Sequence, residues 1–268
     1  MTKLRDIFFI MEEIAPSRYA SDWDSIGLQI GDPLIEAKGI MIALDPSVEA
    51  VNEAAAEGLN LLITHHPLLF TEIKSLDLSK QIGKIIKTAI KLDVAIFSAH
   101  TNLDATRGGV SDMLAELLHI TELSPLQAAK NADDDLVGIG RIGTFKNRPS
   151  LSDVVNMLKE RLNLDKVRVI GDMDRVIEKV ALCGGSGGSL IEDASELKAD
   201  LYISGDINYH RAKDALDLGL AIIDIGHFSS EKCLIEGLAK KLKEKIKPEQ
   251  GEIPILTFGK EKEPFTIL

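Results

Sequence analysis

Cysteine, basic charge and long apolar runs are all scarce in this chain of 268 residues. The two cysteines, Cys183 and Cys233, are too few for a disulfide framework, so we expect free thiols in a reducing cytosol. The formal net charge of −11 disfavours nucleic acid and anionic membranes as partners, although a bound cation could still allow a nucleotide to bind. No apolar run approaches the length of a transmembrane helix, and the amino end lacks a signal-peptide pattern. We therefore expect a cytoplasmic globular protein.

Short apolar segments alternate with helical patterns along the chain. Residues 40–66 give a strand, a helix rich in Ala and Glu, and a second strand, which together form a βαβ unit. Residues 180–206 align with this segment at a constant offset of 140 without a gap. Any two βαβ units look alike, but a histidine followed four residues later by a carboxylate also recurs in both halves. We predict an α/β fold of two similar, intertwined lobes from an internal repeat, with mainly parallel sheets and helices on both faces.

The boundary between the lobes is expected near residue 128, where a polar segment precedes a Gly-interrupted strand. Residues 1–128 would form the first α/β lobe, and residues 129–221 would form the second. The third strand of the second repeat leads the chain back toward the predicted site. Residues 222–268 are therefore expected to pack on the first lobe.

Potential metal ligands stand directly after three of the predicted strands. In an open parallel sheet, ligands bind outside the carboxyl ends of the strands, so side chains at these ends should converge. A lone histidine near a strand is more often structural, and each carboxylate could instead serve a turn or a helix end. Three imidazoles and two carboxylates at strand ends nevertheless favour a metal site. The five predicted ligands are His65, His66, Asp104, His227 and Glu231.

The arrangement of these ligands favours two ions. Successive side chains of a strand point to opposite faces, so His65 and His66 would more readily straddle two ions than chelate one. Glu231 lies one helical turn after His227, and its carboxylate could bridge ions about 3.5–4 Å apart, as two-metal hydrolytic sites require. Nitrogen and carboxylate ligands suit zinc, iron, manganese, cobalt or nickel, and the sequence does not choose among these divalent ions.

Other residues near the predicted strand ends could transfer protons or bind substrate. His100 could be a ligand, a partner of a ligand or a proton donor, and His210 and Asp206 could face the cleft as acid–base groups. We take these three as the candidate catalytic residues. The Gly-rich loop at residues 183–189 has backbone NH groups that suit an anion such as phosphate, although a close backbone approach without a ligand explains it equally well.

Six segments carry a resemblance to a known family: WDSIGLQIGD, ITHHPLLF, AHTNLDATRGGV, CGGSGG, SGDINYH and IGHFSSE. In this order, over nearly the whole chain, they resemble the Ngg-interacting-factor-three-like family, often labelled GTP cyclohydrolase 1 type 2. The resemblance implies a two-lobed subunit, a toroidal homohexamer and a dinuclear metal site in each subunit. It also implies the ligand sets: His65 and His227 for one ion, His66 and Asp104 for the other, and Glu231 as the bridge. Some members carry an inserted domain, for which this chain is too short.

We therefore expect a metal-dependent hydrolase in which two ions activate a water that attacks a nucleotide-type substrate. For a GTP cyclohydrolase, the attacked atom would be C8 of the purine ring, and formate would be released. A phosphoester or amide substrate fits the same residues. The alternatives are a non-enzymatic metal-binding scaffold, a metal carrier or a protein-interaction factor, and a purely structural role without metal.

Overall fold

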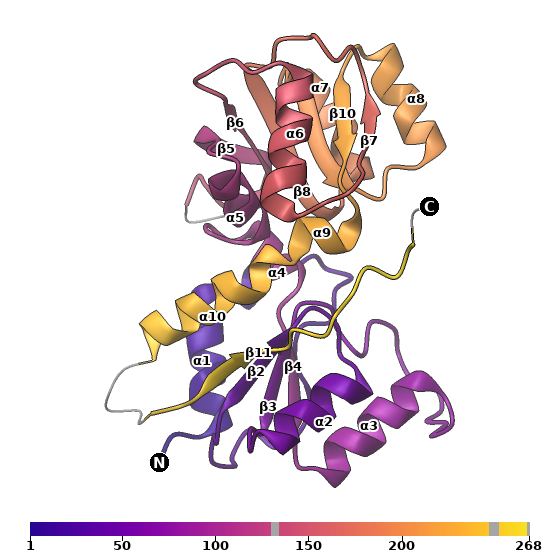
Figure 1. The fold of residues 1–268 in the computed structure, drawn as a ribbon. Coiled ribbons are helices and arrows are strands. Elements are labelled where there is room, and N and C mark those ends of the chain that lie inside the picture. The colour runs from indigo at the N-terminus through magenta and orange to yellow at the C-terminus, as the bar shows by residue number, and fades with distance from the viewer. Residues whose placement is uncertain (130–133, 247–251, 267–268) are drawn as a thin grey trace. The chain divides into compact units, whose positions relative to one another are not determined.

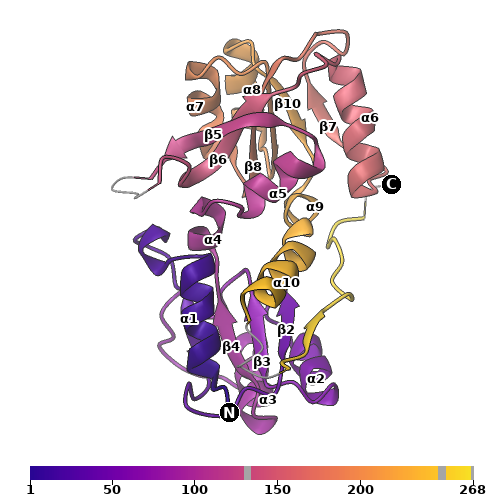
Figure 2. The same cartoon turned by 90° about the vertical axis from the view of Figure 1, so that its left-hand side faces the viewer.

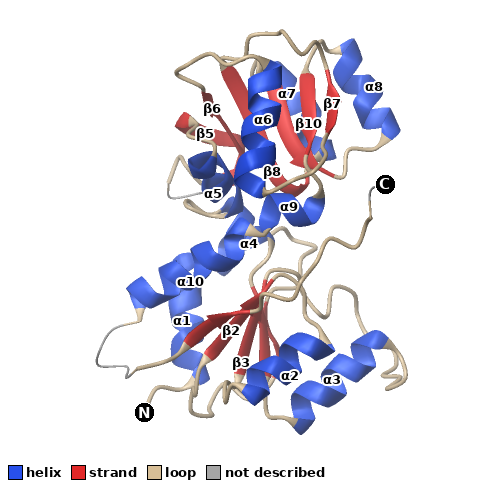
Figure 3. Cartoon of the chain, viewed as in Figure 1, coloured by secondary structure: helices blue, strands red, loops and turns tan. Residues whose placement is uncertain are grey.

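The computed structural model describes residues 1–129, 134–246 and 252–266, and the chain divides into two compact units (Figure 1). The first unit comprises Met1–Leu103 and Ile235–Glu261, and the second comprises Asp104–Leu234 and Lys262–Leu268. Each unit combines a sheet with helices (Figure 3), which confirms the predicted α/β class. Within the described ranges, no helix is long and apolar enough to cross a membrane.

The first unit is built on a five-stranded sheet, counted over the described residues, in the order β1-β4-β3-β2-β11. Four of these strands run parallel, and β1 is an antiparallel edge strand beside β4. Every residue of β2 and β3 is buried, which explains their continuous apolar sequences. The strands are β1 Gly27–Ile30, β2 Ile40–Ala43, β3 Leu61–Thr64, β4 Ala95–Ser98 and β11 Ile255–Thr257.

Helices cover both faces of this sheet, as predicted. In Figures 1 and 2, α2 and α3 lie on one face and α1 and α10 on the other. Phe8 of α1 stacks on Phe97 of β4 with ring centroids 4.8 Å apart. The helices of this unit are α1 Leu4–Ile14, the short η1 Ser17–Tyr19, α2 Val48–Ala56, α3 Gln81–Lys91 and most of α10 Cys233–Lys245. The short α4 Thr101–Ala105 leads into the second unit.

The second unit contains a six-stranded sheet within the described residues, in the order β5-β6-β8-β9-β10-β7. Its centre, β8, β9 and β10, is parallel as predicted. The three remaining pairings are antiparallel, so this sheet is more mixed than the sequence indicated. The strands are β5 Thr121–Ala128, β6 Gly138–Thr144, β7 Arg168–Ile170, β8 Lys179–Ser186, β9 Leu201–Gly205 and β10 Ala221–Asp224.

Alternate residues of this sheet point to helices on opposite faces. Val180 and Leu182 of β8 pack with α5 and α6, whereas Ala181 and Cys183 pack with α7 and α8. Figure 2 shows these helices around the sheet. A capping box at Ser150 begins α6. The helices are α5 Val110–Leu117, α6 Leu151–Leu162, the short η2 Gly188–Leu190, α7 Ile191–Glu196, α8 Tyr209–Asp217 and α9 His227–Glu231.

The internal repeat extends to individual hydrogen bonds. The Lys38 amide donates to Asn60 Oδ1 at 2.8 Å, and at the same offset of 140 the Glu178 amide donates to Asp200 Oδ2 at 3.0 Å. Strand β1 lies antiparallel beside β4, and β7 lies antiparallel beside β10 in the same way. The repeated unit is therefore larger than the βαβ segments from which we predicted it.

The division between the units differs from the predicted boundary near residue 128. The chain leaves the first unit after Leu103, because β5 pairs with β6 and so joins the second sheet. The return begins at Ile235 and not at residue 222, because β10 pairs with β9. β11 pairs with β2 in the first unit, whereas Lys262–Leu268 belongs to the second.

Candidate metal centre

Three histidines of the first unit gather at the carboxyl ends of β3 and β4. His65 and His66 directly follow β3, and His100 follows β4, which is the parallel neighbour of β3. One ring nitrogen from each histidine lies within 4.8 Å of the others, so this group could hold a metal ion. The structure thus brings His100, a candidate catalytic residue, together with two predicted ligands.

The buried His65 ring is fixed by a backbone carbonyl. Its Nδ1 lies 2.9 Å from the carbonyl oxygen of Ala99. A carbonyl oxygen only accepts hydrogen bonds, so Nδ1 of His65 must carry the proton. The lone pair of the neutral ring is therefore on Nε2, the atom through which such an imidazole can bind a metal.

Carboxylates hold the other two rings in the same manner. His66 Nδ1 lies 2.9 Å from Asp45 Oδ1, and His100 Nδ1 lies 2.9 Å from Asp24 Oδ1. Burial raises the pKa of Asp24, but hydrogen bonds from His100 and Thr101 outweigh it, so the pKa is lowered. Asp24 is therefore an ionised acceptor, and it orients the His100 ring in the carboxylate–histidine arrangement typical of metal ligands.

The second unit presents His227 and Glu231 one turn apart on α9, as the sequence predicted. His227 Nδ1 lies 2.8 Å from Asp206 Oδ2, and His227 Nε2 lies 3.2 Å from Glu231 Oε2. Asp206 has a φ of 55°, an uncommon left-handed backbone conformation for this residue type. Through this contact Asp206 orients the His227 ring, and its acid–base role stays a prediction.

The Gly-rich loop packs against this ligand pair. A Cβ atom at Gly185 would lie 2.4 Å from Glu231 Oε1, so only glycine leaves room for the carboxylate. The amide of Gly185 donates to Ser230 Oγ at 2.8 Å, and the amide of Gly187 donates to Ser204 Oγ at 3.0 Å. These amides are used inside the unit, which favours the close backbone approach over the phosphate-binding interpretation of the loop.

Asp104, the fifth predicted ligand, belongs to the same unit as Glu231. Burial, together with the charges of Asp104 and Glu231, raises the pKa of the Cys183 thiol to about 12. Both carboxylates therefore act electrostatically on Cys183. Because this thiol stays protonated near neutral pH, the predicted donors remain nitrogen and oxygen.

Arg141 fixes the segment that follows Asp104. Its side chain is almost fully buried and donates to both Asp112 oxygens, at 2.7 and 2.8 Å. The same guanidinium donates to the carbonyl of Thr106 at 3.1 Å. A buried, bidentate pair of this kind holds its partners in one geometry. Arg141 and Asp112 thus constrain the backbone two residues after Asp104.

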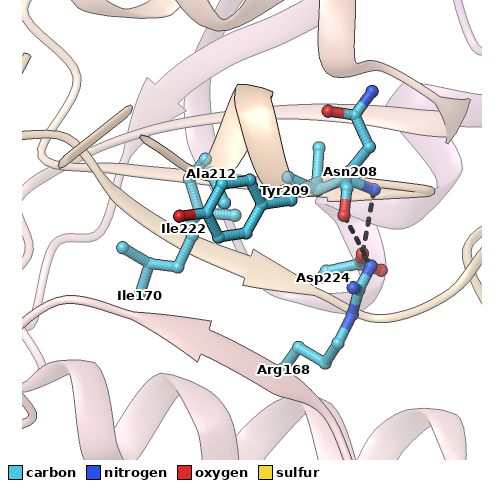
Figure 4. Close-up of a pocket in the computed structure, with 8 residues that line it drawn as sticks. Arg168, Ile170, Asn208, Tyr209, Ala212, Ile222 and Asp224 are labelled. Atoms are coloured by element: carbon cyan, nitrogen blue, oxygen red, sulfur yellow. Dashed lines mark hydrogen bonds and ion pairs between the residues drawn. The ribbon is translucent and has the colours of Figure 1, made fainter. Parts of the chain in front are cut away.

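Asp224 joins the two segments that carry Asp206 and His227. Its carboxylate accepts the amides of Ile207 and Gly226, both at 2.9 Å, and it pairs with Arg168 (Figure 4). Both residues of this ion pair line a pocket of about 280 Å³, whose surface is mainly apolar. The pocket is lined by Arg168, Ile170, Ile207, Asn208, Tyr209, Ala212, Ile222 and Asp224, none of which is a predicted ligand.

Some residues of the site were not found from the sequence. Asp45 stands at the end of β2, the same strand-end position that revealed the histidines, so this signal was present but missed. Asp24 lies in a segment without a strand pattern. Glu261 accepts the amides of Leu44 and Asp45, and burial raises its pKa, yet nothing in its sequence neighbourhood indicates this contact.

His210 remains a prediction as a catalytic residue. It is exposed on α8, and its ring lies edge-on to Tyr209 with centroids 5.6 Å apart. This contact involves neither His227 nor Glu231, the ligand pair of α9.

The fold and the oriented imidazoles define an α/β protein with a candidate metal centre. A family model described as Duf34/NIF3 (NGG1p interacting factor 3) matches residues 2–264, and the chain belongs to this family. A Clostridium perfringens protein named GTP cyclohydrolase 1 type 2 homolog is 35% identical over 99% of this chain and 100% of the relative. A Streptococcus pneumoniae protein of the same name is 35% identical over 95% of each chain.

Solved structures support the same assignment. A Bacillus cereus protein related to NIF3 has a TM-score of 0.94 and 27% identity, with 99% of each chain covered. Reduced HcgD from Methanocaldococcus jannaschii has a TM-score of 0.80 and 33% identity, covering 96% of this chain and 98% of that one. The chain thus shares its fold with these proteins over nearly its full length.

The close approach at Gly185 predicts that Gly185→Ala weakens metal binding about tenfold or more, because the added methyl group displaces the Glu231 carboxylate. Elemental analysis after zinc loading and dialysis measures the effect. Gly219→Ala is the matched control, since Gly219 has a similar φ of 68° but nothing within 4 Å of the added Cβ. Equal metal retention by the two variants would contradict the role given to Gly185.

The contact between Asp206 and His227 predicts that Asp206→Ala weakens metal affinity about 10- to 100-fold, because the His227 ring loses the acceptor that orients it. Asp206→Asn should lose less, since its amide oxygen still accepts and asparagine tolerates a positive φ. Calorimetric zinc titration measures both affinities. If Asp206→Ala binds zinc as tightly as a variant of the exposed Asp217, Asp206 does not position a ligand.

Proposed function

We propose that the chain is a dinuclear metal-dependent hydrolase that acts on a nucleotide-type substrate. The observation that supports this most directly is the common orientation of the imidazoles. Nδ1 is engaged by an oxygen acceptor in His65, His66 and His227, which leaves Nε2 of each neutral ring as the atom that would bind a metal. Membership in the Duf34/NIF3 family agrees with this proposal.

The proposed ligand sets follow the family resemblance. One ion would be held by His65 and His227, the other by His66 and Asp104, and Glu231 would bridge them. Glu231 suits this role because it is buried and one of its oxygens lies 3.2 Å from His227 Nε2. The same resemblance leads us to propose a toroidal homohexamer as the assembled form.

When bound, a pair of divalent ions supplies Lewis-acid chemistry, activating water and polarising the bond that is attacked. The chain's own residues orient the donors and move the proton. His100 is the proposed proton-transfer group, because its ring lies 5.1 Å from that of His65 and is held by the ionised Asp24. The exposed His210 is the second candidate for this step.

The name of the relatives, GTP cyclohydrolase 1 type 2 homolog, leads us to propose GTP as the first substrate to test. Water would add at C8 of the purine, the imidazole ring of the base would open, and formate would leave after a second hydrolytic step. Hydrolysis of a phosphoester or an amide uses the same groups, so formate release distinguishes the cyclohydrolase version. Bound metal without turnover on any of these substrates would favour the metal carrier or interaction factor.

We expect His66→Asn to reduce formate release from GTP by the metal-loaded protein at least a hundredfold, since it removes a ligand. His119→Asn is the matched control, because His119 is exposed and has a φ of 57°, which asparagine tolerates. Far-ultraviolet circular dichroism shows that both variants fold. Undiminished turnover by His66→Asn would reject the proposed site, whereas no turnover by the unmodified protein would reject only the GTP reaction.

A further inference from the structure

Two large aromatic side chains stand exposed beside the three histidines of the first unit. Trp23 is 61% exposed and Phe70 is 52% exposed. The Trp23 ring centroid lies 5.7 Å from that of Phe70 and 6.2 Å from that of His100, and Phe70 lies 6.3 Å from His100. All three contacts are edge-on, so no two of these rings are stacked face to face.

The turn that carries Trp23 is held firmly on both sides. The Ser21 amide donates to Thr101 Oγ1 at 2.9 Å, and the Asp24 amide donates to the Ser21 carbonyl at 2.9 Å. The Asp24 carboxylate in turn accepts the Thr101 amide at 3.0 Å and binds His100. The indole is therefore presented by a fixed backbone that also orients His100, although the ring itself is exposed.

Phe70 is presented in a similar way. Leu68 is buried in the core of the first unit, and the Leu69 amide donates to Gln29 Oε1 at 3.0 Å. These contacts anchor the turn after β3 and leave Phe70 at its exposed end. Two preorganised aromatic rings beside candidate metal ligands could bind a planar ring, because planar rings bind aromatic side chains by stacking.

We propose that Trp23 and Phe70 bind the planar heteroaromatic ring of the substrate next to His100. The inference rests on the proposed hydrolytic function, and it specifies the substrate class as a purine or a related fused heterocycle. Stacking tolerates different ring substituents, so the aromatic pair selects for a planar ring and not for one particular base. The ring would lie beside the group that we assign to proton transfer.

The chain contains a single tryptophan, so intrinsic tryptophan fluorescence reports on Trp23 alone. The experiment titrates the full-length, zinc-loaded protein with GTP, ATP and ribose 5-phosphate. We expect both nucleotides to quench the fluorescence and ribose 5-phosphate, which has no aromatic ring, to leave it unchanged. Absence of quenching by both nucleotides would overturn the inference.

Equilibrium dialysis then measures GTP affinity in variants without relying on fluorescence. Trp23→Ala should bind GTP about tenfold or more weakly, and Phe70→Leu should also bind it more weakly, whereas Trp23→Phe, which keeps a ring, should stay within about threefold of the original chain. Phe9→Ala removes a comparably exposed ring, 67% exposed on α1, and should leave GTP affinity unchanged.

Two further outcomes would overturn the inference. Trp23→Ala could bind GTP as tightly as the original chain, or it could change the mass of the particle in solution while GTP affinity is kept, which would make the ring an assembly contact. Formate release distinguishes the two proposals. If Trp23→Ala binds GTP more weakly but neither it nor the original chain releases formate, only the proposed hydrolase activity is rejected. If Trp23→Ala releases formate at the full rate with an unchanged KM, only the aromatic subsite is rejected.

Discussion

The hydrogen bond at Nδ1 of each strand-end histidine is the constraint on which the candidate site depends. It fixes the tautomer, the ring orientation and the position of Nε2 before any ion binds. A backbone carbonyl supplies the acceptor for His65, whereas Asp45 and Asp206 supply it for His66 and His227. Donors that are already oriented lose less conformational entropy when a ligand binds, which favours a defined metal geometry.

The duplicated fold carries different side chains at equivalent strand ends of its two units. At the offset of 140, the first unit has Asp45 and His66 where the second has Gly185 and Asp206. Asp45 holds a histidine from the end of β2, but Gly185 leaves that space to Glu231. Asp206 replaces a histidine and instead orients His227. The equivalent strand ends of the two units thus carry different potential donors.

The sequence predicted the buried centre of the fold better than its edges. β2, β3, β9 and β10 are short apolar runs whose period and length are recognisable, and the pairing of His227 with Glu231 follows from helical spacing. Edge strands β1, β5 and β7 lack such runs because few of their residues are buried. Because β5 was not predicted as a strand of the second sheet, the boundary between the units was placed too late in the chain. The contact of Asp24 with His100 joins residues far apart in the sequence, so no local pattern predicts it.

Anomalous diffraction at the zinc edge, from crystals of the zinc-loaded full-length chain, tests the central claim most directly. The account predicts bound ions about 2.0–2.1 Å from Nε2 of His65, His66 and His227, with each Nδ1 still on its oxygen acceptor. Ions bound through Nδ1, or located away from all three of these rings, would contradict it.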